Sequence, residues 1–105
     1  VADFKKVRSD DGFWNLVTAQ CFPLYSILLA VNRTLVDYLS LDVEGHEIKV
    51  LQTIPWHKVD FNAMTIEWLR TPGGVKALRY FMESQPNDLV HYDSFLRDLL
   101  YAKVQ

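Results

Sequence analysis

One stretch of this chain, residues 36–47, restricts the fold more than any other. An apolar run leads to two carboxylates, Asp42 and Glu44, then to Gly45, and then to a helical pattern. This order is typical of a buried strand whose carboxyl end delivers polar side chains to the start of a helix. Open α/β sheets bind their ligands at that end of the strands, so the stretch indicates both a fold class and a candidate site.

The rest of the chain alternates between short helical and strand patterns. Apolar spacing predicts helices from residue 22 or 23 to 31, over 47–54 and over 75–84. Strand patterns lie at 36–42, 63–69, 88–93 and 98–104. The connection between the first two strands is long enough for a helical crossover and predicts a parallel pair, whereas the last two are close enough only for an antiparallel pair. The sequence therefore predicts an α/β fold with a mixed sheet, and the apolar run at 36–41 predicts that both faces of the sheet are covered.

The first fifteen residues differ from the rest. Residues 1–15 are polar and contain a turn signal at 8–12, so we interpret them as a lead-in segment before a domain at 16–105. The chain opens at Val1 without an initiator Met, and no secretory signal is visible. We therefore expect a fragment or a processed product.

Charge and composition exclude several classes of function. The formal net charge of −2 leaves no basic excess for binding nucleic acid. The longest apolar-rich stretch, residues 21–31, is too short to span a bilayer. Cys21 is the single cysteine, which excludes an internal disulfide, and we expect it to be a small buried residue. No metal-ligand spacing links the three histidines, and we assign no metal ligands.

Two interpretations of the carboxylates follow from the residues alone. Asp42 and Glu44 are two apart and would share a face of an extended strand, while Glu67 ends the neighbouring strand. Three converging carboxylates raise one another's proton affinity unless a cation or a donor lies between them, which favours a ligand site. Alternatively, Asp42 or Glu44 caps the amides of residues 46–48 at the start of the next helix. His46 is expected to be solvated or hydrogen-bonded, and the tryptophans at 14, 56 and 68 to be core or lid residues.

Residues 37–51 resemble the signature of FkbM-type methyltransferases. In that family an apolar strand runs into Asp-x-Glu-Gly-x-Glu, which matches Asp42, Glu44, Gly45 and Glu47 here. Residues 21–26, 53–56 and 66–67 are similar to the animal branch of the family, which includes Star-like proteins, and residues 98–103 are similar to the closing strand of the family. The resemblance covers roughly residues 20–104.

The resemblance implies a class I, Rossmann-like methyltransferase fold that transfers a methyl group from S-adenosylmethionine to a hydroxyl oxygen. That fold has seven strands, of which this chain matches the last four, so the chain is expected to be the C-terminal half of the domain. The glycine-rich cofactor loop belongs to the other half, and S-adenosylmethionine is not expected to bind this chain alone. Asp42, Glu44 and Glu67 would be the catalytic residues of the acceptor side, with Gly45, His46 and Glu47 beside them, and the acceptor would be a small-molecule or glycan hydroxyl.

A second interpretation stands beside this one, and the sequence leaves open whether catalysis is retained. A methyltransferase-like domain without activity would serve as a binding module for a protein partner, as in Star-like trafficking proteins. That likeness is compatible with association with membranes of the secretory pathway. In either case the edge of the strand at 36–41 is expected to be open and to invite self-association.

Overall fold

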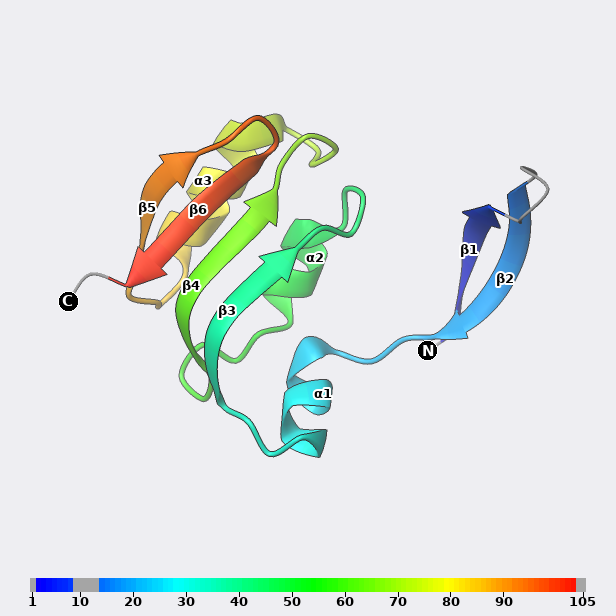
Figure 1. Cartoon of the computed structure of the whole chain (residues 1–105), viewed down its shortest axis with the longest axis horizontal. Helices are drawn as coiled ribbons and strands as arrows, with labels where there is room; N and C mark the ends of the chain where they lie inside the picture. Colours follow the sequence, from blue (N-terminus) through cyan, green and yellow to red (C-terminus); the bar gives the residue numbers. More distant parts are fainter. Residues whose placement is uncertain (1, 9–13, 104–105) are drawn as a thin grey trace.

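The computed structural model describes residues 2–8 and 14–103, with side chains described from residue 17 onward. Within these ranges the chain forms a two-stranded hairpin, a four-stranded sheet and three helices (Figure 1).

The hairpin was not predicted from the sequence. Strands β1 (Ala2–Arg8) and β2 (Trp14–Gln20) pair antiparallel, with Ala2 opposite Gln20 and Arg8 opposite Trp14. The hairpin stands apart from the larger sheet in Figure 1. The apolar residues of these strands are too scattered in the sequence to give a strong alternating pattern. Most of the predicted turn at 8–12 lies outside the described residues.

The four-stranded sheet has the predicted strands and pairings. It consists of β3 (Leu35–Leu41), β4 (Asp60–Glu67), β5 (Leu89–Ser94) and β6 (Asp98–Lys103), in the order β3-β4-β6-β5. Strands β3 and β4 are parallel and β5 and β6 are antiparallel, which confirms both predictions. Strand β6 also runs antiparallel to β4, so it lies inside the sheet and β5 forms the outer edge.

The three helices occupy the predicted parts of the chain. They are α1 (Leu24–Ala30), α2 (Glu47–Gln52) and α3 (Gly74–Ser84). Helices α2 and α3 lie on one face of the sheet, behind it in Figure 1. Leu51 of α2 and Leu78 of α3 are fully buried in the core that this face shares with Met64 and Ile66 of β4.

The prediction that both faces of the sheet are covered is wrong for the described residues. Tyr38 of β3 is 55% exposed and Val90 of β5 is 50% exposed, and the register aligns both on one face of the sheet. No helix of the described chain packs over the face that is turned toward the viewer in Figure 1. The apolar run at 36–41 therefore reflects one buried face and one uncovered face, which a run without alternation does not distinguish.

Cys21 is exposed, so its expected burial is also wrong. It lies in the connection between β2 and α1, outside the core, with its sulfur 3.9 Å from the carbonyl oxygen of Ala19. Trp56 and Trp68 are partly buried against the core, as predicted, and the side chain of Trp14 lies outside the described residues. Among residues 2–8 and 14–103, no helix is long and apolar enough to cross a membrane.

Candidate functional site

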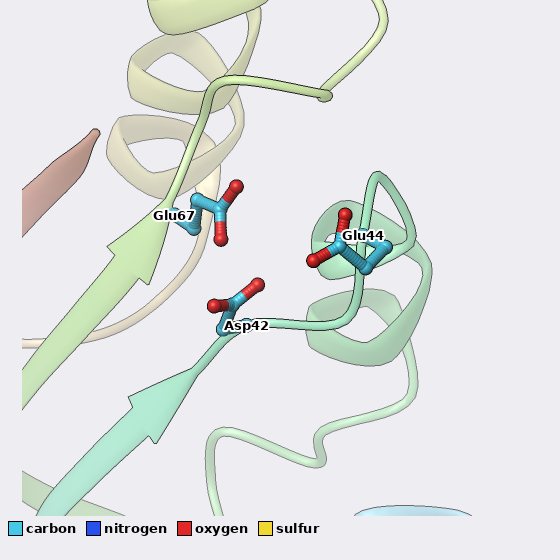
Figure 2. Close-up of side chains that lie close together, drawn as sticks. All are labelled: Asp42, Glu44 and Glu67. Carbon is cyan, nitrogen blue, oxygen red and sulfur yellow. The ribbon is translucent and has the colours of Figure 1, made fainter. Parts of the chain in front are cut away.

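Three carboxylates gather at the carboxyl ends of the two parallel strands. Strand β3 ends at Leu41, directly before Asp42, and Glu67 is the last residue of β4. Since Leu41 lies opposite Ile66 in the register, both strands deliver their next residue to the same edge of the sheet. One carboxylate oxygen from each of Asp42, Glu44 and Glu67 lies within 4.8 Å of the others (Figure 2).

A turn, and not the alternation of a strand, brings Asp42 and Glu44 together. The strand stops before Asp42, and Glu44 has a φ of +53°, in the left-handed region that residues with a side chain seldom adopt. The prediction that both side chains share a face of an extended strand is therefore wrong. The two carboxylates do converge, but a turn brings them together. The turn directs the Glu44 side chain back toward Asp42 and Glu67 (Figure 2).

Glu47 holds this turn in place. Its side chain is 1% exposed, and its two carboxylate oxygens accept hydrogen bonds from the backbone amides of Val43 at 2.6 Å and Gly45 at 3.0 Å. A buried carboxylate that accepts two amide hydrogen bonds compensates for the loss of its hydration. Glu47 is therefore a structural residue of the site.

The capping interpretation of Asp42 and Glu44 does not hold. Helix α2 has His46 at its N-cap position, with no hydrogen bond from a side chain to the helix amides. Asp42 and Glu44 make none to the amides of residues 46–48. The His46 side chain is exposed, as expected for a solvated histidine.

Gly45 and Arg70 join the turn to the loop after β4. Gly45 has a φ of +99°, and a Cβ atom there would lie 2.8 Å from the carbonyl oxygen of Arg70, so only glycine fits without strain. The Arg70 guanidinium pairs with the Glu44 carboxylate at 2.7 Å, with both side chains largely exposed. Arg70 was not predicted, because its contact depends on how the two loops meet.

Glu67 has the most perturbed environment of the three. Its side chain is 7% exposed. The pKa of Glu67 is raised from 4.5 to about 7, first by a hydrogen bond shared with the Asp42 carboxyl, which requires a proton, and then by burial. The negative charges of Asp42, Glu44 and Glu47 raise it further. Near neutral pH this carboxyl is therefore able both to accept and to release a proton.

The arrangement suits a hydroxyl group or a hard cation. Carboxylate oxygens around one Mg²⁺ or Ca²⁺ lie at about 2.0–2.6 Å from the ion, and therefore within about 5 Å of one another. The spacing of the three carboxylates meets this condition. The same oxygens would accept a hydrogen bond from a hydroxyl group and orient it.

A mixed α/β sheet with polar residues at the ends of its parallel strands fits a methyltransferase-like domain. Comparison with protein families matches residues 11–102 to the family described as the Methyltransferase FkbM domain. The chain therefore belongs to the FkbM methyltransferase family. No curated protein and no solved structure matches it.

Proposed function

We propose that this chain supplies the acceptor side of an S-adenosylmethionine-dependent O-methyltransferase site. Membership of the family indicates a methyltransferase-like function. The observation that supports the finer assignment is the convergence of Asp42, Glu44 and Glu67 at the ends of two adjacent parallel strands, where α/β sheets bind ligands.

Each carboxylate has a separate role in this proposal. Asp42 accepts a hydrogen bond from the acceptor hydroxyl and orients its oxygen. Glu67 takes the hydroxyl proton as the methyl group passes to that oxygen, which leaves a methyl ether and a protonated Glu67. Glu44, held by Arg70, closes the side of the site, and Gly45, His46 and Glu47 shape the turn around it. S-adenosylmethionine supplies the methyl group from its sulfonium sulfur.

In this proposal the chain forms only one half of the methyltransferase domain. Residues 16–105, which include the four-stranded sheet, would be the C-terminal half of a class I, Rossmann-like domain. The animal, Star-like branch is the part of the family that we favour. The cofactor would bind the other half of that domain, through a glycine-rich loop at the start of a helix. We therefore expect no useful binding of S-adenosylmethionine by this chain alone.

A binding module without catalysis is the second candidate function. It is favoured by the uncovered face of the sheet and by the free edge of β3, with which no strand of the described residues pairs. Unpaired strand edges and apolar faces are surfaces that proteins use to recognise partners. In this function the carboxylates would contact a partner protein.

The two candidates differ in methyl transfer. The full-length protein would be incubated with methyl-labelled S-adenosylmethionine and a panel of small alcohols and glycans. We expect transfer by the wild type, a loss of roughly a hundredfold or more in Glu67→Gln, and normal transfer in Glu83→Gln, which changes an exposed carboxylate on α3. No transfer by the wild type to any acceptor would favour the binding module, and equal transfer by Glu67→Gln would contradict the role of Glu67.

A further inference from the structure

A cleft lies between helix α3 and the outer edge of the sheet. Its volume is about 330 Å³, and its lining comes from α3, from the connection after it, and from β5 and β6. Helix α3 lies behind these two strands in Figure 1. Tyr101, which lines the cleft, is opposite Met64 in the register, three residues before Glu67 on β4. The cleft is therefore separate from the three carboxylates, none of which lines it.

Tyr101 contributes a buried hydroxyl group to this cleft. The residue is 1% exposed, and its hydroxyl has no hydrogen-bond partner among residues 2–8 and 14–103. A hydroxyl that loses its hydration without gaining a partner is costly, and most buried polar groups avoid this state. Burial raises the pKa of Tyr101 above its ordinary value of 10.0, so the hydroxyl keeps its proton at neutral pH and can donate it. The cleft therefore holds a donor that lacks an acceptor.

A second donor lies beside this hydroxyl. The charges of Arg79 and Glu83 both act on the pKa of Tyr101, which places the two side chains next to it. The Arg79 Nη2 atom is 3.3 Å from the Glu83 Oε1 atom, longer than the distance of about 2.7–2.9 Å in a strong ion pair. The two side chains are 46% and 62% exposed, so this pair contributes little to stability. Arg79 is thus free to turn from Glu83 to another acceptor.

The remaining walls of the cleft are apolar or aromatic. Met82 of α3 is 2% exposed, and Leu89 of β5 packs partly buried against the core. The His91 ring meets the Tyr101 ring edge to face, with centroids 5.7 Å apart, and its Nε2 atom is 2.8 Å from the Ser94 hydroxyl. These contacts fix the wall on the β5 side. A ligand with a short apolar body would find apolar side chains next to the two donors.

The charges in the cleft select a group with one negative charge. Arg79 is the cation that lines it, and Glu83 lies beside Arg79. A single carboxylate would replace Glu83 as the partner of Arg79, whereas a doubly charged phosphate would leave one negative charge uncompensated beside Glu83. The two oxygens of a carboxylate also accept hydrogen bonds from two donors at once.

We propose that this cleft binds a monocarboxylate with a short apolar body, and that its carboxylate accepts hydrogen bonds from the Arg79 guanidinium and the Tyr101 hydroxyl. Arg79 turns away from Glu83 to reach the ligand, and this rotation opens the path to the hydroxyl beneath. Glu83 then faces water and takes no part in binding. The inference does not depend on the proposed function, because the cleft shares no residue with the carboxylate site.

The test uses three probes with the same alkyl chain. Amide chemical shifts of the full-length protein would be followed during titration with hexanoate, hexanamide and hexyl phosphate. We expect hexanoate to bind with a dissociation constant of roughly a millimolar, as for other ligands of this size, and the other two roughly tenfold more weakly. The shifts should be concentrated at α3, β5 and β6. Equal binding of hexanamide, tighter binding of hexyl phosphate, or shifts spread over α1 and the uncovered face of the sheet would overturn the proposal.

Two variants test the two donors. Tyr101→Phe removes the hydroxyl and keeps the ring, and Arg79→Gln removes the charge of an exposed side chain. Each should weaken the binding of hexanoate by roughly tenfold, because each removes a hydrogen bond to a charged group. Tyr80→Phe is the control for the first variant, since Tyr80 is 77% exposed on α3. Arg33→Gln, which changes an exposed arginine after α1, is the control for the second.

The melting temperature separates a binding role of Tyr101 from a structural one. Removing a buried hydroxyl that has no partner should leave the melting temperature of Tyr101→Phe unchanged or higher. A folded Tyr101→Phe variant that binds hexanoate as well as the wild type would contradict the role of the hydroxyl. Unchanged binding by Arg79→Gln, or equal weakening by Arg33→Gln, would contradict the role of Arg79.

Discussion

At the scale of single residues, Glu47 is the carboxylate that fixes the geometry of the site. Its two oxygens bind the amides of Val43 and Gly45, and its side chain is buried. Asp42 and Glu44 lie on the turn that these bonds close. The shape of the site therefore depends on a residue that does not itself join the cluster of three carboxylates.

Replacing Glu47 by Gln should destabilise the protein. The amide group keeps one acceptor oxygen and places an NH₂ group against a backbone N–H, so one amide is left without its acceptor. We expect a loss of about 1–3 kcal/mol in the free energy of unfolding, measured by urea denaturation. Glu44→Gln is the matched control and should change it by less than about 1 kcal/mol, since the ion pair of Glu44 is exposed. Equal effects of the two variants would contradict the role of Glu47.

The raised pKa of Glu67 predicts how stability depends on pH. Because its folded-state pKa, about 7, lies above the ordinary value of 4.5, the folded state binds the proton more tightly than the unfolded state. Its contribution to stability is therefore fully present below about pH 4.5 and is lost as the pH rises through 7. The melting temperature of the wild type should fall between pH 5 and 8 relative to that of Glu67→Gln. Parallel curves for the two proteins would show that Glu67 titrates normally.

The positions of the site residues could be predicted from the sequence, but their contacts could not. Asp42 follows one apolar strand and Glu67 ends the next, and the length of the connection predicts parallel strands whose ends meet. The left-handed conformation of Glu44 and the contact of Arg70 with it depend on how two loops pack. No local pattern encodes such a contact, because its residues are distant in the sequence.

At the scale of elements, the lengths of the connections predicted strand pairing better than the apolar runs predicted burial. They predicted the parallel β3–β4 pair and the antiparallel β5–β6 pair. The apolar run of β3 wrongly predicted a covered face, and the scattered apolar residues of β1 and β2 gave no prediction of a hairpin. Chain connectivity limits which strands can pair, whereas burial depends on elements elsewhere in the structure.

The free edge of β3 predicts self-association of this chain. Its backbone groups on that side pair with no strand of the described residues, and Leu35 and Tyr38 beside them are exposed. Such an edge accepts a strand from a second molecule. Sedimentation velocity should show oligomers at micromolar concentration, and Leu35→Lys should weaken them by roughly tenfold.

Ile27→Lys, on the exposed side of α1, is the control for this experiment. It should leave the oligomers intact, because it does not change the strand edge. Dispersal by Ile27→Lys and not by Leu35→Lys would assign the contact to α1. A wild-type chain that remains a monomer and unfolds cooperatively would contradict the prediction.

At the scale of the whole molecule, the chain is less compact than an ordinary domain of its size. Its radius of gyration is 15.1 Å, against about 13 Å for a compact domain of a hundred residues. The hairpin that stands apart and the sheet with one uncovered face account for the difference. A domain with this shape has apolar surface left to bury, which is consistent with the proposal that the sheet is half of a larger one.

The central claim is that Asp42 serves a ligand site, and Asp42→Asn tests it most directly. The variant removes one negative charge from a repulsive cluster and keeps a similar shape, so stability should hold or rise. The same change removes the carboxylate that orients the acceptor. The melting temperature and the methyl transfer of the full-length protein and this variant would be measured side by side. The account predicts an unchanged or higher melting temperature together with loss of transfer, and full transfer by the variant would contradict it.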